Sequence, residues 1–256
     1  MKEVIHGDCL IEMQKIPDKS IDMVLTSPPY DNLRDYKGYT FDFEGIAKEI
    51  YRVLKDGGVC VWVVGDATIK GSETGTSFKQ ALYFKEIGFN LHDTMIWEKQ
   101  TFTAVGALKS RYAPVFEYMF IFTKGKLKTF NPIKDRKNTT AGQKIGRKGG
   151  IRKRNGELVP NSSYGTDKVK AEYGQRFNIW RIIIGQRSNG HPAPFPEKLA
   201  EDHILSWSNE GDTILDPMAG SGTTLKMAKK NNRNYIGIEI SQEYIDIINK
   251  RLSPQQ

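Results

Sequence analysis

Short apolar runs alternate with amphipathic stretches through the first hundred residues of this chain. The runs Val4–His6, Asp22–Thr26 and Val59–Val64 have the length of strands, and the last is β-branched and bounded by glycines, as expected of a buried parallel strand. Between them, Leu10–Lys15 and Glu44–Leu54 show helical spacing, and the second runs into Lys-Asp-Gly-Gly, a helix stop signal. The alternation predicts an α/β protein with a doubly wound sheet.

The pattern continues along the chain with one interruption. Between residues 131 and 176 the sequence is rich in small, polar and basic residues and has little periodicity, which is unusual inside a compact domain unless the segment is functional. We therefore predict a first half over residues 1–98, an insert over 99–176 and a second half over 177–256. The further expected elements are helices at Phe78–Ile87, Pro196–Trp207, Thr223–Lys230 and Gln242–Leu252, and strands at Asn90–Trp97, Val115–Phe122, Trp180–Ile184, Thr213–Leu215 and Tyr235–Glu239.

A net charge of +8, equal to that of the whole chain, lies within residues 134–176 of this insert. Twelve basic and four acidic residues lie between Lys134 and Arg176, whereas the rest of the chain holds 26 of each sign. A charge run is often only a solvated surface, but confinement of the full excess to one segment favours a polyanionic partner. Lysine and arginine neutralise phosphates, and arginine also fits the major-groove edge of guanine. The candidate residues for contacts with such a partner are Arg147, Lys148, Arg152, Lys153 and Arg154.

Composition excludes several other classes of protein. A hydrophobic fraction of 38% is enough for a packed core, while no apolar run reaches the length of a membrane span or a signal peptide. Cys9 and Cys60 form neither a disulfide framework nor a metal-ligand pair, and the four histidines show no metal spacing. We therefore expect a soluble, cytoplasmic protein with no metal centre and no membrane association.

A glycine-rich turn, Asp216-Pro-Met-Ala-Gly-Ser-Gly-Thr-Thr224, joins an expected strand to an expected helix. Its glycines allow the backbone to approach a ligand at the carboxyl edge of the sheet, although the spacing differs from that of dinucleotide sites. An ordinary tight turn is the alternative. Glu239 ends the next expected strand, where a carboxylate can accept both hydroxyls of a ribose; its alternative role is to cap a helix.

The most specific motif is Ser27-Pro28-Pro29-Tyr30, directly after an expected strand. The prolines end the strand and stiffen the turn. The Ser27 hydroxyl and Pro28 carbonyl could hold both hydrogens of an exocyclic amino group, turning its delocalised lone pair out of the ring plane. Tyr30 could stack on a base flipped out of a duplex. The alternative is a plain proline turn.

Together these motifs resemble those of the β-type DNA amino methyltransferases, which use S-adenosylmethionine to methylate N4 of cytosine or N6 of adenine. Asn234-Tyr-Ile-Gly-Ile-Glu-Ile240 and His191-Pro-Ala-Pro-Phe-Pro-Glu-Lys-Leu199 are also similar to segments of this family. The resemblance covers nearly the whole chain. It implies a Rossmann-like doubly wound methyltransferase sheet with an inserted basic target-recognition segment. The catalytic motif precedes the cofactor motif, which distinguishes the chain from protein glutamine methyltransferases and many RNA methyltransferases.

The resemblance implies a role for each residue at a matching position. S-adenosylmethionine would be bound by Asp8, Cys9, Phe195, Asp216, Pro217, Ala219, Gly220, Ser221, Gly222, Thr223 and Glu239, and the catalytic set would be Ser27, Pro28, Pro29 and Tyr30. Met218 stands where an aromatic residue is usual. The partner implied is double-stranded DNA, and the family is compatible with a homodimer and with a cognate restriction endonuclease.

The target base is less constrained than the chemistry. Serine at the first motif position is more common in N4-cytosine enzymes and Asp or Asn in adenine enzymes, so Ser27 favours cytosine. Adenine N6, modified by the same mechanism, is the first alternative. An inactive relative that only binds nucleic acid and an enzyme for structured RNA are the others.

Overall fold

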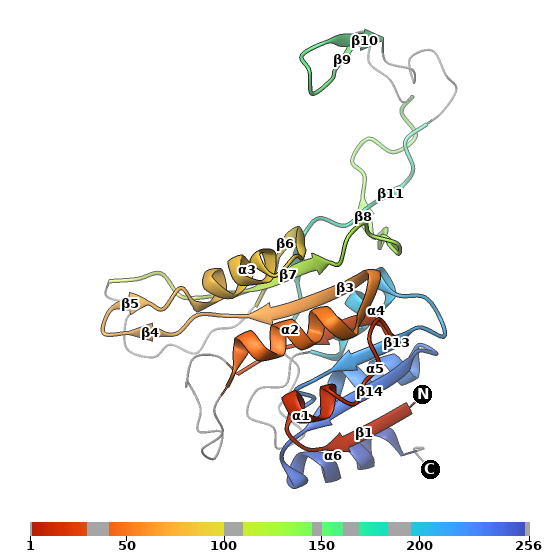
Figure 1. Ribbon diagram of the computed structural model, residues 1–256. Helices are drawn as coiled ribbons and strands as arrows, with labels where there is room; N and C mark the ends of the chain where they lie inside the picture. The colour runs from red at the N-terminus through yellow and green to blue at the C-terminus, as the bar shows by residue number, and fades with distance from the viewer. Residues whose placement is uncertain are drawn as a thin grey trace. The chain divides into compact units, whose positions relative to one another are not determined.

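The computed structural model describes residues 2–29, 41–99, 110–144, 150–160, 169–183 and 196–253 (Figure 1). The chain forms two compact units, one made of Met1–Asn131 with Asn178–Gln256 and the other of Pro132–Phe177. The smaller unit nearly coincides with the segment that carries the net charge. It begins later than the insert expected from residue 99, because residues 116–123 form a strand of the central sheet.

The larger unit is built on an eight-stranded sheet of order β1-β14-β13-β2-β3-β7-β6-β12. All of its strands are parallel except β7, which pairs antiparallel with both β3 and β6. The strands are β1 (Lys2–His6), β2 (Ile21–Thr26), β3 (Leu54–Val64), β6 (Asn90–Glu98), β7 (Phe116–Thr123), β12 (Ile179–Arg181), β13 (Thr213–Asp216) and β14 (Asn234–Glu239). The expected Rossmann-like α/β fold is confirmed, with a mixed sheet.

Two groups of helices cover the sheet. The helices α1 (Cys9–Met13), α2 (Phe43–Val53) and α3 (Thr76–Glu86) contact one another in sequence, as do α4 (Glu197–Trp207), α5 (Thr223–Lys230) and α6 (Gln242–Leu252). Side chains alternate between the two faces of a strand. In β7, Phe120 and Phe122 join the core beneath α1–α3, whereas Met119 contacts His203 of α4. Among the described ranges, no helix is long and apolar enough to cross a membrane.

The core beneath the first helix group is aromatic. Trp62 and Phe84 are fully buried, and Phe84 stacks on Phe122 with ring centroids 4.6 Å apart. The buried indole of Trp62 donates a hydrogen bond to Gln80 Oε1 at 2.8 Å, so its polar group is satisfied inside the core. Helix α2 contributes its apolar face, Ile46, Ala47, Ile50 and Val53, at the helical spacing that the sequence predicts.

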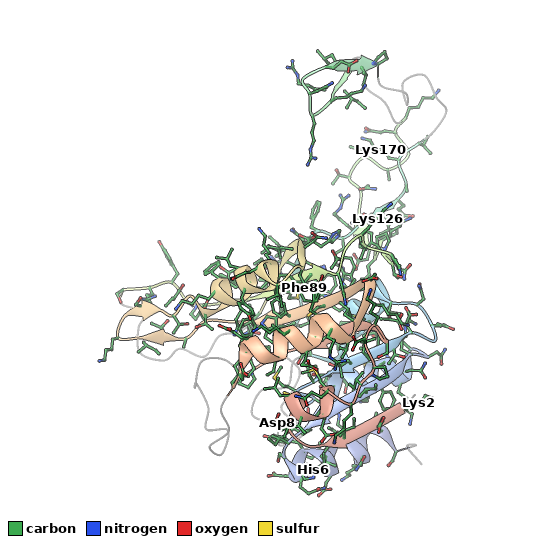
Figure 2. All side chains as sticks on the ribbon, viewed as in Figure 1. Lys2, His6, Asp8, Phe89, Lys126 and Lys170 are labelled. Atoms are coloured by element: carbon green, nitrogen blue, oxygen red, sulfur yellow. The ribbon has the colours of Figure 1, made fainter. Side chains whose placement is uncertain are left out.

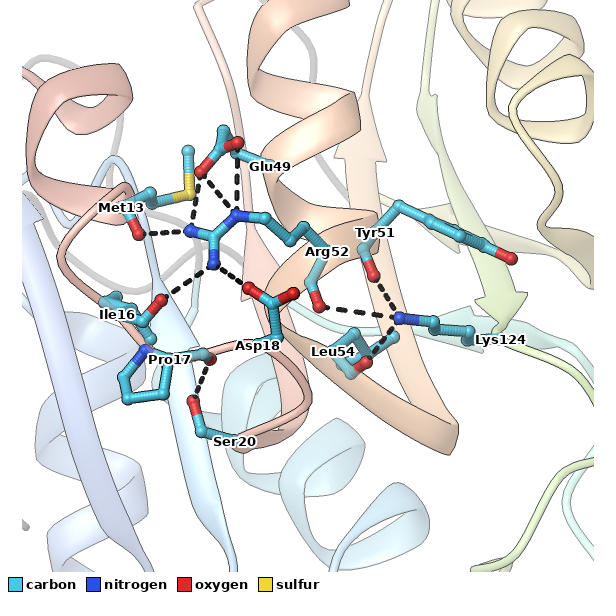
Figure 3. Close-up of polar contacts among 10 residues, drawn as sticks. All are labelled: Met13, Ile16, Pro17, Asp18, Ser20, Glu49, Tyr51, Arg52, Leu54 and Lys124. Atoms are coloured by element: carbon cyan, nitrogen blue, oxygen red, sulfur yellow. Dashed lines mark hydrogen bonds and ion pairs between the residues drawn. The ribbon is translucent and has the colours of Figure 1, made fainter.

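Two basic side chains donate to backbone carbonyls where α1 and α2 end (Figure 3). Lys124 is 7% exposed, and its ammonium donates to the carbonyls of Tyr51 at 2.6 Å and Leu54 at 2.9 Å. Arg52 donates to the carbonyls of Met13 at 2.6 Å and Ile16 at 2.9 Å, and so fixes the turn after α1. Cations at a helix C-terminus satisfy its free carbonyls. Burial lowers the pKa of Lys124.

The Lys-Asp-Gly-Gly segment after α2 belongs to a strand instead of a turn. Helix α2 ends at Val53, and β3 begins at Leu54. The register between β2 and β3 jumps at this point, since Leu54 pairs with Ile21 but Val59 pairs with Met23. A short hairpin of β4 (Thr68–Ile69) and β5 (Ser72–Glu73), which the sequence did not predict, follows β3.

The direction of the connections reverses between β2 and β13. From β2 the chain continues to β3 on one side, and from β13 it continues to β14 on the other. Ligands of open α/β sheets bind in the crevice outside the carboxyl ends of the strands at such a switch point. The fold therefore places the expected site where β2 and β13 end.

The smaller unit contains two ladders of short antiparallel strands. One pairs β8 (Arg136–Lys137) with β11 (Tyr173–Gly174), and Lys170, labelled in Figure 2, donates from its ammonium to Thr140 Oγ1 at 2.8 Å nearby. The other is a hairpin of β9 (Gly150–Arg152) and β10 (Leu158–Pro160). Nearly every residue of this hairpin is exposed.

Candidate active site

Polar and acidic side chains that could bind a ligand lie at or just after the ends of four neighbouring parallel strands. Asp8 lies after β1 (Figure 2), Glu239 ends β14, Asp216 ends β13 and Ser27 follows β2. The strands are in register at this edge: Glu239 pairs with His6 of β1, and Leu215 pairs with Val24. The carboxyl ends of parallel strands meet at one edge of a sheet, so residues from opposite ends of the chain lie together at this edge, where a ligand crevice is expected.

The glycine loop after β13 is tied down by its own backbone amides. Ala219 N–H donates to the Ile238 carbonyl at 2.9 Å, and Gly222 N–H donates to the Ala219 carbonyl at 2.8 Å. Gly222 has a φ of +77°, and a Cβ there would lie 2.9 Å from Ile248 Cγ1 of α6. The conformation and the close contact both require glycine. The loop is therefore a rigid, closely packed turn.

Glu239 is the residue that fastens this loop to the neighbouring strand. Its Oε2 accepts from Gly220 N–H at 2.8 Å, and its Oε1 accepts from Ser241 N–H at 2.9 Å. Burial raises the pKa of Glu239, against the effect of these amide donors. A carboxylate has about four acceptor positions. Two amide bonds therefore leave lone pairs on both oxygens for the hydroxyls of a ribose, which is the donor set that the cofactor would bring.

Asp8 and Cys9 border the crevice from the side of β1. The Asp8 carboxylate caps α1, accepting from Leu10 N–H at 2.8 Å. The Cys9 thiol is partly buried, and this burial, with the nearby Asp8 charge, raises its pKa to about 12. The thiol is therefore protonated at neutral pH and can offer only a weak S–H contact.

Asp216 is the most deeply buried acid of the crevice. It is 2% exposed, and its Oδ1 accepts from Met218 N–H at 3.2 Å, so the carboxylate shapes the loop from inside. Burial raises the pKa of Asp216 to about 6, and hydrogen bonds, the first from Thr224, oppose the rise. The neighbouring Pro217 and Ala219 are also buried.

The raised pKa of Asp216 predicts a pH dependence of stability. An unfolded aspartate ionises near pH 3.9, so between about pH 4 and 6 the folded state binds a proton that the unfolded state has released. The free energy of unfolding therefore falls as the pH rises through this window, by about 3 kcal/mol in total. We expect the Asp216→Asn variant to lack this loss, so that its melting temperature gains on that of the wild type from pH 4 to pH 7. A difference in melting temperature between the two proteins that stays constant from pH 4 to pH 7 would contradict a raised pKa of Asp216.

The catalytic motif begins on the other side of the switch point. Ser27 and Pro29 are half-buried and Pro28 is buried, directly after the fully buried end of β2. The segments after β2 and β13 meet here, because Thr224 Oγ1 of α5 lies 3.3 Å from the Leu25 carbonyl oxygen. Tyr30, Phe195, Arg147 and Lys148 lie outside the described residues.

The basic candidates that the structure describes lie on the exposed hairpin of the smaller unit. Arg152 ends β9, and Lys153 and Arg154 lead into its turn. Lys153 pairs with Glu157 across the turn at 3.3 Å. Within the described ranges, no group of His, Cys, Asp and Glu side chains could hold a metal ion.

Arg251, in the last turn of α6, also lies against the glycine loop, although sequence reasoning gave it no role. Its guanidinium donates to the Ser221 carbonyl at 2.6 Å and to Ser221 Oγ at 3.0 Å. The Ser221 hydroxyl therefore accepts from Arg251. The contact between Arg251 and Ser221 joins residues 30 positions apart and is revealed only by the fold.

Comparison with known proteins gives consistent matches. Residues 21–250 match the DNA methylase family of N6 and N4 enzymes. The chain is 59% identical over 246 residues to the orphan methyltransferase M.BamHII of Bacillus amyloliquefaciens, covering 93% of this chain and 91% of the relative. It is 31% identical over 278 residues to the DNA adenine methyltransferase YhdJ of Escherichia coli (strain K12), covering 98% and 82%.

Solved structures share the fold. The PvuII DNA methyltransferase (cytosine-N4-specific) aligns with a TM-score of 0.72 and 21% identity, covering 99% of this chain and 86% of that one. The complex of M1.HpyAVI with S-adenosylmethionine aligns with a TM-score of 0.66 and 21% identity, covering 99% and 100%.

The solved structures that share this sheet are methyltransferases, the class that takes its methyl group from S-adenosylmethionine, and one of them was solved with that cofactor. Within that class, the match over residues 21–250 shows that the chain belongs to the DNA methylase family and is a DNA amino methyltransferase. The expected family, fold class and cofactor are thereby confirmed.

Proposed function

We propose that this DNA amino methyltransferase modifies N4 of cytosine in double-stranded DNA. The observation that carries the proposal is Ser27, which stands at the first position of the catalytic motif and follows β2 at the switch point. The cytosine-N4-specific PvuII enzyme has the same fold, so the fold is compatible with this target. The adenine specificity of the relative from Escherichia coli supports the alternative target, adenine N6.

In the proposed mechanism the base leaves the duplex and enters the crevice beside β2. The Ser27 hydroxyl and the Pro28 carbonyl accept the two amino hydrogens, which turns the nitrogen lone pair toward the cofactor side. Tyr30 stacks on the base and holds its plane. S-adenosylmethionine supplies a methyl group on an already activated sulfonium, so the residues contribute position and electrostatic complementarity. Glu239 and Ser27 lie at the ends of different strands at this edge, which suits separate roles in binding the cofactor and in holding the base.

The smaller unit is the proposed target-recognition segment. A two-stranded hairpin is marginally stable unless it packs on other structure. The β9–β10 hairpin is exposed along most of its length, so its surface is available for a partner such as DNA. Two-stranded ribbons fit the major groove, where arginine pairs with guanine. Arg154 follows Lys153 at the turn, and the turn is closed by Lys153 N–H donating to the Glu157 carbonyl at 2.8 Å. We assign Arg154 to DNA, together with Arg152, Lys153 and, outside the described residues, Arg147 and Lys148.

Replacing Arg154 by alanine is expected to weaken DNA binding about tenfold, the effect of losing one base or phosphate contact of an arginine. Fluorescence anisotropy with a labelled mixed-sequence DNA duplex measures the dissociation constant. Lys85→Ala, which removes an exposed basic side chain from α3, is the matched control and should bind like the wild type. Equal affinity of the Arg154 variant and the wild type would exclude this residue from the interface.

The experiment that tests the proposed function is nucleoside analysis of methylated DNA. The protein is incubated with isotope-labelled S-adenosylmethionine and mixed-sequence duplex DNA, and the digested nucleosides are separated by mass spectrometry. Labelled N4-methylcytosine is the expected product. N6-methyladenine would overturn the cytosine assignment while keeping the mechanism. Label in a structured-RNA competitor, with none in DNA, would overturn the assignment of the basic unit.

A further inference from the structure

An arginine on the last helix connects two segments that lie far apart in the sequence. Arg251 Nη1 donates to the carbonyl and the hydroxyl of Ser221 in the glycine loop and approaches Thr223 Oγ1 at 3.3 Å. Its Nη2 donates to Glu197 Oε1 at 2.8 Å. Glu197 is the first residue of α4 and belongs to the His191–Leu199 motif. One guanidinium therefore bridges the loop and the segment that both resemble cofactor-binding parts of the family.

The bridge is protected from water on the side of the loop. Ser221 is 3% exposed and Thr223 is 4% exposed, and the Arg251 side chain is only 12% exposed. Lys226 of α5 donates to the same Glu197 oxygen at 2.7 Å, so Glu197 carries two cationic partners. Hydrogen bonds between charged groups in such a setting are stronger than those at an open surface. Glu197 itself is partly exposed and is therefore the weaker end of the bridge.

The same helix supports the loop a second time. Ile248, one turn before Arg251, packs against the Cα of Gly222, where a Cβ would lie 2.9 Å from Ile248 Cγ1. Helix α6 thus contacts three successive residues of the loop, by packing at Gly222 and by hydrogen bonds at Ser221 and Thr223. Gly220, next in the chain, is held by Glu239.

From this arrangement we propose that Arg251 is a positioning residue for the cofactor, and that its bridge from Ser221 to Glu197 sets the affinity for S-adenosylmethionine. Arg251 acts through the loop backbone, because its donors face Ser221 and Glu197. The inference rests on the proposed function only in that the methyl donor occupies this crevice. A loop that is free to shift would lose its fit to the cofactor, while Ser27, on the other strand, would keep its place.

The test compares Arg251→Met with Arg251→Lys, Glu197→Gln and the control Lys250→Met, which removes the neighbouring exposed cation of the same helix. Isothermal titration calorimetry gives the dissociation constant of S-adenosylmethionine, and steady-state kinetics gives KM for cofactor and DNA and kcat. For Arg251→Met we expect about tenfold weaker cofactor binding, a matching rise of the cofactor KM, and an unchanged kcat and DNA KM. Arg251→Lys should recover part of the loss, and Glu197→Gln should show a smaller one.

Two results would overturn the inference. One is unchanged cofactor affinity in a folded Arg251→Met variant. The other is an Arg251→Met variant that melts at a lower temperature but is stabilised by the cofactor as much as the wild type is. A purely structural role of Arg251 predicts this pattern. The calorimetry does not depend on the target base. If the wild type binds the cofactor but methylates no DNA, the proposed function fails while the role of Arg251 is still measured.

Discussion

Replacing Ser27 by alanine is expected to lower kcat at least about 100-fold while leaving the affinity for S-adenosylmethionine close to that of the wild type. Loss of one preorganised polar group at a reacting centre costs about 100- to 1000-fold in turnover. Ser27 follows β2, whereas the loop that holds the cofactor follows β13, so the two effects can be separated. Single-turnover kinetics with saturating DNA, combined with calorimetric titration of the cofactor, measures both quantities.

Ser27→Asn is the matched variant for this prediction. Asparagine keeps a side-chain acceptor at the first motif position, where Asp or Asn is common in related adenine enzymes, so it should keep more activity than alanine. If Ser27→Ala had full activity, the assignment of the amino-group acceptor would be wrong. If alanine and asparagine lowered kcat equally, the loss would come from the shape of the turn instead of the acceptor.

The second large effect is expected at Glu239. Replacement by alanine removes a carboxylate that accepts from Gly220 N–H and Ser241 N–H and that we expect to bind the cofactor hydroxyls. Hydrogen bonds to a charged group contribute about 1.5–3 kcal/mol each. Losing the two bonds expected between the Glu239 carboxylate and the cofactor hydroxyls should therefore weaken cofactor binding about 100-fold or more. Calorimetric titration with S-adenosylmethionine measures this change directly.

Glutamine is expected to be nearly as damaging as alanine at this position. Both carboxylate oxygens of Glu239 accept from a backbone N–H, so the amide NH2 of glutamine would face a donor whichever way it turned. Glu243→Gln, on the exposed side of the first turn of α6, is the control and should bind the cofactor normally. A Glu239→Gln variant with wild-type affinity would show that the carboxylate is dispensable.

Most elements of the fold could be predicted from the sequence because their patterns are local. Amphipathic spacing located α2, and β-branched runs located strands such as Val59–Val64 within β3. The direction of β7 was beyond reach, since the apolar residues of Phe116–Thr123 suit either orientation. The end of α2 at Val53 was also within reach, since the expected helix stops at Leu54; the register jump between β2 and β3 that follows is a tertiary feature without a local signal.

The site divides in the same way. Sequence motifs located the candidate site residues, because the glycine loop and Ser27 each follow a strand and Glu239 ends one. Their mutual contacts had no signal in the sequence. The hydrogen bond from Gly220 N–H to Glu239 depends on the pairing of β13 with β14, and the position of Arg251 beside Ser221 depends on the packing of α6. The roles of all the candidate site residues, Tyr30 and Phe195 included, stay predictions.

The sheet order has a consequence for how the chain is made. β1 lies at the edge of the sheet, and its neighbour is β14; β2 likewise needs β13, and Asp22 accepts from Thr213 N–H across 191 residues of chain. During synthesis the first two strands emerge long before these partners exist. Closing such long loops is slow, and unpaired apolar strand edges attract other chains. The candidate active site is therefore completed only when β13 and β14 leave the ribosome. A nascent chain that stalls earlier has no activity and exposes the unpaired edge of β2.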